Sequence, residues 1–175
     1  MKIEITDLLS AVNKIEEHHV SIELDAFRTR LGEFPITKKA PFELHLENQE
    51  NKRILISGET DVTIAIPCDR CLEEVSVVLH LVIDRKYTIV EPETEEEEST
   101  EDADYMTGSD LNVDRLVYDE ILVNWPMKVL CREDSKGICK NCGTNLNYRT
   151  CSCDRTVPDP RMAAIQDVFN QFKEV

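Results

Sequence analysis

The stretch Arg53-Ile-Leu-Ile-Ser-Gly-Glu-Thr-Asp-Val-Thr-Ile-Ala-Ile-Pro67-Cys68-Asp-Arg-Cys71 alternates largely apolar and polar side chains up to its proline. Alternation with a period of two is typical of a long β-strand with one buried face. Gly58 is expected to mark a bulge or bend, because glycine inside a strand often does so. We expect Pro67 to end the strand and the residues from Cys68 to Cys71 to form the turn after it.

Segments on both sides extend this strand into an antiparallel sheet. Alternation resumes after the turn, so the first cysteine pair is expected at the tip of a long hairpin. Two shorter alternations upstream predict further strands, and the turn-like residues 48–51 separate the nearer one from the long strand. The residues that carry these patterns are Val75, Val77, Leu79, Leu81, Ile83, Tyr87 and Ile89 in the return strand, Phe42, Leu44 and Leu46 in the nearer strand, and Val20, Ile22 and Leu24 in the farther strand.

Three helices are predicted from their starting residues and apolar stripes. Thr6 or Asp7 can cap the first helix, Asn112 the second, and Asp159 with Pro160 the third. The second helix must end near Trp125, because a proline follows. The stripes are Leu8, Leu9, Val12 and Ile15 in the first helix, Val113, Leu116, Val117 and Ile121 in the second, and Met162, Ile165, Phe169 and Phe172 in the third.

The predicted fold class is α+β: a curved antiparallel β-sheet or partial barrel with a few helices and a small cysteine-rich zinc module. Residues 1–90 are expected to form the mainly antiparallel β domain, ending in the long hairpin tipped by Cys68 and Cys71. Residues 91–110 are expected to be an acidic flexible loop. Residues 111–175 are expected to hold a helix, the cysteine-rich module and a C-terminal helix that packs on the sheet.

The charge of the chain is concentrated in one segment. The 175 residues carry a formal net charge of −15, and nine of the acids lie in residues 91–104, which contain no base. The remainder is only mildly acidic. The acidic run indicates a solvated, disordered linker, or alternatively a phosphate mimic that holds a basic partner. No apolar run is long enough to span a membrane, and acids stand where a signal peptide would be apolar, so a cytoplasmic protein is expected.

Seven cysteines, an odd number in a protein expected in a reducing compartment, favour metal binding or redox chemistry over a disulfide framework. Cys139-Lys-Asn-Cys142 and Cys151-Ser-Cys153 present four sulfurs from two loops, a pattern that suits a tetrahedral zinc ion. The surrounding segment is poor in apolar residues, so a bound metal is expected to hold it together. The predicted cofactor is therefore Zn²⁺ at Cys139, Cys142, Cys151 and Cys153.

The other three cysteines are harder to interpret. Cys68 and Cys71 alone could be a partial metal site, a redox pair or a coincidence. Cys131 could complete a second site with them if the hairpin tip packs against the cysteine-rich module. A thioredoxin-like redox site needs its attacking thiol at the start of a helix, whereas Cys68 follows a strand and a proline.

The sequence contains no phosphate-binding glycine-rich loop, no nucleophile elbow and no His-Glu-x-x-His helix. It therefore favours neither an enzyme nor a small-molecule substrate. The region around the later cysteines is weakly basic and lacks the strong positive charge of a dedicated nucleic-acid binder. Its candidate contacts to RNA or to another partner are Lys136, Lys140, Arg149 and Arg155.

Several motifs, in order along nearly the whole chain, resemble the YceD-like family of large ribosomal RNA subunit accumulation proteins. They are Pro67-Cys68-Asp-Arg-Cys71-Leu72-Glu73, Trp125-Pro126-Met-Lys-Val-Leu-Cys131, Gly137-Ile-Cys139-Lys-Asn-Cys142-Gly143, Asn145-Leu146-Asn147, Cys151-Ser-Cys153 and Asp159-Pro160-Arg161-Met162. Fuller members of that family tend to carry a cysteine at the position of Ser135, so the resemblance implies that a site formed by Cys68, Cys71 and Cys131 lacks its fourth ligand.

The resemblance implies a role in producing the large ribosomal subunit, without a known reaction. We therefore expect an assembly factor that contacts a ribosomal protein or the large-subunit ribosomal RNA precursor. The acidity of the chain favours a basic ribosomal protein as the direct partner. The alternative class is a thiol-based redox or zinc-responsive regulator.

Overall fold

The computed structural model describes residues 1–89 and 105–153, and these form a mostly antiparallel β-sheet structure with two helices. Two open sheets are present in this part of the chain, one of six strands and one of three. The elements are β1 (Lys2–Glu4), α1 (Thr6–Ser10), β2 (Ile15–Val20), β3 (Ala26–Thr29), β4 (Gly32–Lys39), β5 (Phe42–Gln49), β6 (Arg53–Pro67), β7 (Glu74–Thr88), β8 (Met106–Thr107), β9 (Asp110–Asn112) and α2 (Val113–Val123).

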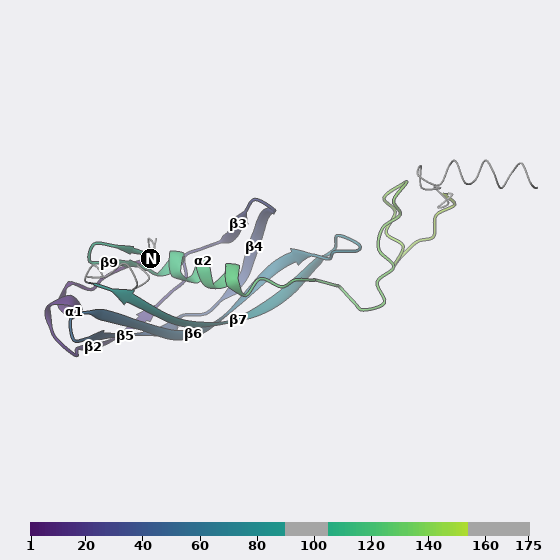
Figure 1. Cartoon of the computed structure of the whole chain (residues 1–175). Helices are drawn as coiled ribbons and strands as arrows, with labels where there is room; N and C mark the ends of the chain where they lie inside the picture. Colours follow the sequence, from purple (N-terminus) through teal and green to yellow (C-terminus); the bar gives the residue numbers. More distant parts are fainter. Residues whose placement is uncertain (90–104, 154–175) are drawn as a thin grey trace, which may run out of the picture.

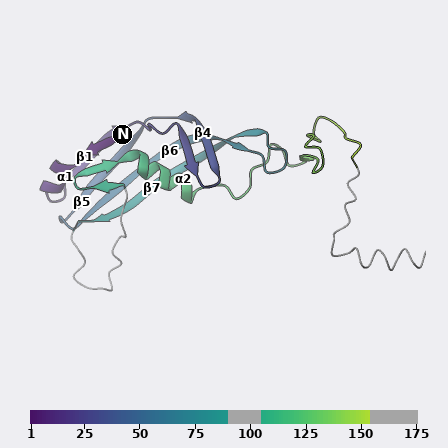
Figure 2. The same ribbon diagram turned by 90° about the horizontal axis from the view of Figure 1, so that it is seen from above.

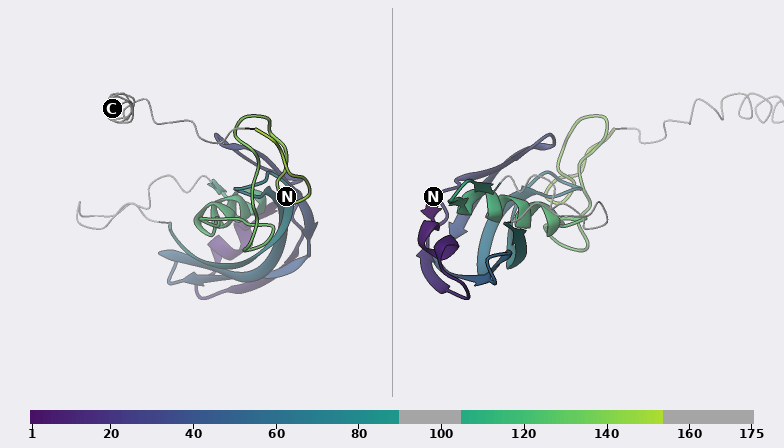
Figure 3. Two further views of the ribbon diagram at one scale, coloured as in Figure 1. Left: turned by 90° about the vertical axis from the view of Figure 1, so that its right-hand side faces the viewer. Right: turned by 60° about the vertical axis from the view of Figure 1, so that its left-hand side comes forward.

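The long strand β6 organises the larger sheet. Strand β7 pairs with it along its whole length, from Arg53 opposite Thr88 to Pro67 opposite Glu74. On the other edge of β6, β5 pairs with the first part of the strand and β4 with the last part. Strand β2 then pairs with β5, and β3 with β4. Figure 3 shows the resulting sheet curving around α2 without closing.

The core lies between the concave side of this sheet, the two helices and the small sheet β1-β9-β8. Helix α2 buries one apolar stripe there, as its sequence predicts. Arg85 of β7 forms an ion pair of 2.6 Å with Glu120 of α2, whose side chain is almost fully buried. The pair is important because an unpartnered buried carboxylate would be strongly destabilising.

The hairpin of β6 and β7 extends beyond α2 toward residues 129–153, here called the cysteine module, as Figure 1 and Figure 2 both show. Within the module the backbone forms turns and one isolated bridge, between Ile138 and Asn145. Its only strongly buried hydrophobic residues among those described are Val129 and Cys139. The module therefore has no apolar core of its own.

Three predicted elements of the sheet and helices are confirmed. Strands β6 and β7 match the predicted hairpin, and β5 contains the predicted strand residues. Helix α2 begins after Asn112, whose side chain accepts a hydrogen bond of 3.2 Å from the Arg115 amide, and it ends before Trp125. The acidic run at residues 91–104 lies outside the described residues. The predicted last helix, which would begin at residue 159, also lies outside them.

Other predictions were wrong in their boundaries. Helix α1 is shorter than expected, its N-cap is Ile5 without a side-chain hydrogen bond, and Ile15 already belongs to β2. The strand predicted from Val20, Ile22 and Leu24 does not continue past Val20, where β2 ends. Residues 21–25 form an irregular link in which Ile22 is nevertheless buried. Pairing with β7 runs through Gly58 without the expected bulge, and pairing with β5 ends at this residue. A Cβ atom at Gly58 would lie 2.9 Å from the carbonyl oxygen of Glu43, so the glycine permits a close approach of β5.

Candidate metal centres

The first cluster consists of Cys139, Cys142, Cys151 and Cys153, whose sulfur atoms all lie within 4.8 Å of one another. A tetrahedral zinc ion with four thiolates places its sulfurs about 3.8 Å apart, so these residues need only small adjustments to share an ion. A tight turn presents the first pair: Cys139 accepts from the amide of Gly143 at 2.8 Å, and Gly143 has a φ of 71°. Glycine is the residue best suited to that conformation.

The thiols of the first cluster influence one another. The hydroxyl and backbone amide of Thr144 lower the pKa of Cys142 to about 6, with smaller contributions from Cys153 and Cys139. The hydrogen bond with Cys142, together with burial, raises the pKa of Cys153 to about 12. The four sulfurs therefore cannot all ionise near neutral pH without a nearby positive charge, which a divalent cation would provide.

The second cluster consists of Cys68 and Cys71 at the hairpin tip and Cys131 in the module. Their sulfurs also lie within 4.8 Å of one another, and Cys71 Sγ is 3.4 Å from Cys131 Sγ. Cys68 and Cys71 are buried. The structure thus brings Cys131 next to two thiols that lie at least sixty residues earlier in the sequence.

The pKa values in the second cluster also diverge. Burial alone would raise the pKa of Cys68, but backbone amides of Cys131, Arg70 and Cys71 outweigh it and lower the value to about 6. The Glu73 amide lowers the pKa of Cys71, but burial and the two neighbouring thiols dominate and raise it to about 11. One sulfur in this cluster is therefore readily ionised, and a second is not.

Asp69, between the two hairpin-tip cysteines, joins the tip to the start of the module. Its amide donates to the carbonyl oxygen of Val129 at 2.9 Å, and its carboxylate accepts from the Val129 amide at 2.7 Å. Sequence reasoning did not identify this role. Its position between two cysteines at a turn was the available signal.

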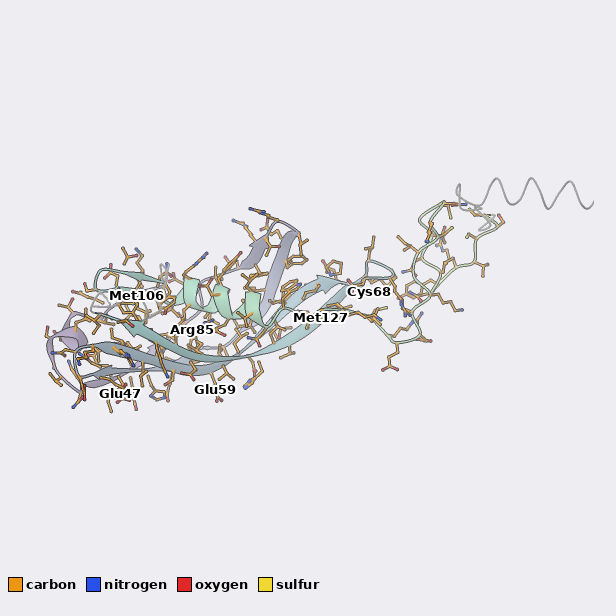
Figure 4. All side chains as sticks on the ribbon, in the orientation of Figure 1. Glu47, Glu59, Cys68, Arg85, Met106 and Met127 are labelled. Carbon is orange, nitrogen blue, oxygen red and sulfur yellow. The ribbon has the colours of Figure 1, made fainter. Side chains whose placement is uncertain are left out.

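Arg70 makes the second connection between the tip and the module. Its guanidinium donates to the carbonyl oxygens of Glu133 at 3.0 Å and Ser135 at 2.9 Å, and its own carbonyl accepts from the Ile138 amide at 3.0 Å. A Cβ atom at Gly137 would lie 2.9 Å from that carbonyl oxygen. The module therefore fits closely against the hairpin tip, and Figure 4 shows Cys68 at this junction.

Two polar residues border the second cluster, and the sequence indicated only one of them. Ser135 is buried, its hydroxyl bonds to the Cys71 sulfur, and its oxygen accepts from the side chain of Asn147 at 3.3 Å. Glu73 has a carboxylate oxygen 3.3 Å from Cys71 Sγ. Hydrogen bonds from Tyr148, then from Cys71, lower the pKa of Glu73. Glu73 directly follows the tip, but nothing in its local sequence predicts this contact.

The donor chemistry of both clusters fits a metal ion. Thiolate sulfur is the preferred donor for zinc and other soft cations, and each cluster gathers sulfurs from two separate loops or segments. The clusters could therefore hold a metal ion. Of the predicted partner contacts, Lys136, Lys140 and Arg149 are exposed on the module, whereas Arg155 lies outside the described residues.

A family model described as "Large ribosomal RNA subunit accumulation protein YceD" matches residues 56–169, which include both cysteine clusters. The chain belongs to the YceD family. The family's name associates its members with accumulation of the large-subunit ribosomal RNA. Membership also confirms the resemblance inferred from the cysteine motifs.

A more distant similarity is to an uncharacterized protein of Mycobacterium leprae (strain TN), with 25% identity over 112 residues. The aligned region covers 61% of this YceD-family chain and 50% of that protein, so the chain spans about half the length of this relative. No solved structure matches the chain significantly. Neither helix in the described part of the chain is long and apolar enough to cross a membrane.

Proposed function

We propose that this protein is a non-enzymatic factor that supports large-subunit ribosomal RNA accumulation and ribosome assembly by binding a ribosomal protein or the ribosomal RNA precursor. Membership in the YceD family supports the ribosomal role. The direct partner that we favour is a basic ribosomal protein in the cytoplasm.

The observation that carries this choice of partner is the charge of the sheet's outer face. This face comprises the residues of β2, β5, β6 and β7 that alternate with the buried ones, and Figure 4 shows Glu47 and Glu59 on the side opposite α2. Acids outnumber bases on it by seven to two. The acids are Glu17, Glu43, Glu47, Glu59, Asp61, Glu74 and Asp84, and the bases are Arg53 and Lys86.

Such a face attracts a basic protein and repels the phosphate backbone of RNA. Bare RNA would instead have to use the candidate contacts Lys136, Lys140 and Arg149 in the module and Arg155, which follows it in the sequence. The acids of the module, and the negative charge of thiolates around a metal, offset these bases. The electrostatic balance therefore favours a protein partner.

Zinc at Cys139, Cys142, Cys151 and Cys153 would have a structural role in this proposal. When bound, the ion would supply a tetrahedral crosslink between two loops that have little apolar packing of their own. The residues of the module would then be held in a fixed arrangement for partner contact.

A cellular depletion experiment tests the ribosomal role. Removing the protein should lower the ratio of large-subunit to small-subunit ribosomal RNA, and restoring it should recover that ratio. An unchanged ratio would contradict the proposed function. Affinity capture of the full-length protein, with identification of bound proteins and RNA, then separates the two partner classes.

The acidic face is tested by the triple variant Glu43→Gln, Glu59→Gln and Glu47→Gln. Capture of basic ribosomal proteins should fall several-fold, most clearly at low salt, because exposed charges act over about 10 Å at 0.1 M salt. A matched control removes the same charge elsewhere, through Glu4→Gln, Asp7→Asn and Glu33→Gln. Equal losses in both variants would contradict a role for this particular face.

One observation favours the alternative function, that of a thiol-based redox or zinc-responsive regulator. Cys71 Sγ and Cys131 Sγ lie 3.4 Å apart, close enough to form a disulfide after a small movement. Oxidation of the purified protein, followed by mass spectrometry of peptides, would detect that bond. Its reversible formation with a change in partner capture would support the regulatory class.

A further inference from the structure

The second cluster has chemical features that packing alone does not explain. Cys68 and Cys71 are buried at the hairpin tip, and both sulfurs face Cys131 from a segment more than fifty residues away in sequence. Buried cysteines in a core are usually surrounded by apolar side chains. Here the surroundings are other thiols, backbone amides, a hydroxyl and a carboxylate.

We propose that Cys68, Cys71 and Cys131 bind a second zinc ion and that the Ser135 hydroxyl is its fourth ligand. This site is separate from the four-cysteine cluster and does not depend on the identity of the ribosomal partner. Its ion crosslinks the hairpin tip to the module. Because one ligand is a hydroxyl, the ion exchanges faster than the ion in the first cluster.

The three sulfurs have the geometry that a shared ion needs. All lie within 4.8 Å of one another, and the closest pair is separated by 3.4 Å. Backbone amides of Arg70, Cys71 and Cys131 point at the sulfur of Cys68. Amides directed at a sulfur stabilise its anionic form, which is the form that binds metal.

Ser135 occupies the fourth position of the cluster. It lies four residues after Cys131, is only 4% exposed and bonds through its hydroxyl to the sulfur of Cys71. Its backbone carbonyl is fixed by Arg70 at 2.9 Å, and its hydroxyl oxygen accepts from Asn147 at 3.3 Å. The backbone of Ser135 is therefore fixed by Arg70 and its hydroxyl by Asn147, beside the sulfur of Cys71.

Glu73 is the other oxygen donor near these sulfurs. Its carboxylate is 3.3 Å from Cys71 Sγ, but it also accepts from Tyr148 and Asn145 and faces Arg132. The three cysteine sulfurs lie within 4.8 Å of one another as a group that does not include a Glu73 oxygen. Glu73 would therefore support Cys71 without binding the ion itself.

A serine ligand has a clear consequence for metal retention. Zinc binding releases to solvent the protons of those thiols that are still protonated, and no group is oxidised or reduced. A neutral hydroxyl is a weaker donor for zinc than a thiolate. Replacing Ser135 with cysteine would add a fourth thiolate at a position already in contact with the other ligands.

The test uses full-length protein purified under reducing conditions without added metal. Elemental analysis should find about two equivalents of zinc per chain. Cys131→Ser and the matched variant Cys142→Ser should each lose about one equivalent, because they affect different sites. Release to a chromogenic chelator should be biphasic, and Cys131→Ser should remove the faster phase.

The Ser135 variants test the fourth ligand directly. Ser135→Cys should slow the faster phase by about tenfold or more, while Ser135→Ala should accelerate it. Unchanged release in Ser135→Cys would overturn the assignment of Ser135. One equivalent of zinc in the parent protein, insensitive to Cys131→Ser, would overturn the second site.

A thiol-labelling measurement covers the case in which a variant fails to fold. In the parent protein, labelling of Cys68, Cys71 and Cys131 should be slow and should become fast after chelation. Fast labelling of these thiols before chelation would overturn metal binding at the second cluster. A Cys71–Cys131 disulfide in the reduced preparation would also overturn it.

Discussion

The β-sheet and the cysteine module are stabilised by different means. The sheet buries apolar side chains from nearly every strand, and residues such as Leu44, Ile56 and Leu81 are completely inaccessible. The module, by contrast, buries Val129 and Cys139 and few other apolar groups among its described residues. Its order depends on hydrogen bonds, on contact with the hairpin tip and, in our proposal, on metal.

Apolar burial spreads stability over many residues, so the sheet should tolerate changes at single surface positions. Thiolate ligation concentrates stability in a few atoms. The two regions should therefore respond in opposite ways to metal removal and to core mutation.

Metal removal should produce the largest effect, and that effect should be confined to the module. Structural zinc sites contribute about 10–16 kcal/mol of apparent binding free energy at neutral pH, so chelation should unfold the segment that depends on them. Hydrogen exchange should become fast across residues 137–153 and remain slow in β6 and β7. Equal loss of protection in β6 would contradict the separation of the two regions.

A core mutation should give the reverse pattern. Leu81→Ala removes a fully buried side chain and should lower the free energy of unfolding of the sheet by about 2–5 kcal/mol. The control is Val82→Ala on the neighbouring, exposed position, where the loss should be below about 1 kcal/mol. Denaturant titration followed by circular dichroism measures both. Similar losses would show that the outer face is covered.

The sequence could predict the sheet because its pattern is repeated over a long stretch. In β6 the even positions from Ile54 to Ile66 are mostly apolar, and all but Gly58 are buried, so period and burial agree. The hairpin of β3 and β4 was not predicted. It contains Pro35, which argues against a strand, and its turn carries Leu31, which is 82% exposed and supplies no core signal.

The sequence could predict the members of the first cluster because these cysteines are close together in the sequence. It could not predict the surroundings of the second cluster, because these depend on how the hairpin tip packs against the module. Asp69 and Arg70 bond to backbone groups about sixty residues away, and no local pattern encodes such partners. The contact between Ser135 and Cys71 has the same origin.

The junction of the two regions can be weakened separately. In Gly137→Ala the new methyl group would lie 2.9 Å from the Arg70 carbonyl oxygen, at a φ of 75°. The module should detach from the tip at a cost of about 1–3 kcal/mol. Faster hydrogen exchange at the Ile138 amide would report it. Gly108→Ala is the control, because it has a φ of 63° but no atoms nearby, and it should leave Ile138 unchanged.

The smallest expected effect is a change in the pKa of His80, on the outer face of the sheet. The hydrogen bond of 2.8 Å to Asp61 raises the pKa of His80 above its ordinary value of 6.5. The stabilisation of the folded protein by this pair is therefore complete below pH 6.5. It is lost as the pH rises through the raised pKa of His80. An NMR titration should show a lower His80 pKa in Asp61→Asn. No change would show that the pair is not formed in solution.

The pairing of the strands also determines an order of events during synthesis. Strands β6 and β7 are joined by a short turn, so their pairing has low contact order and can form as soon as both have emerged. Strand β1 pairs with β9, which is made more than a hundred residues later. The hairpin can therefore hold Cys68 and Cys71 side by side before Cys131 has been translated. The nascent chain would then carry two of the three thiols of the second cluster in place before the module is synthesised.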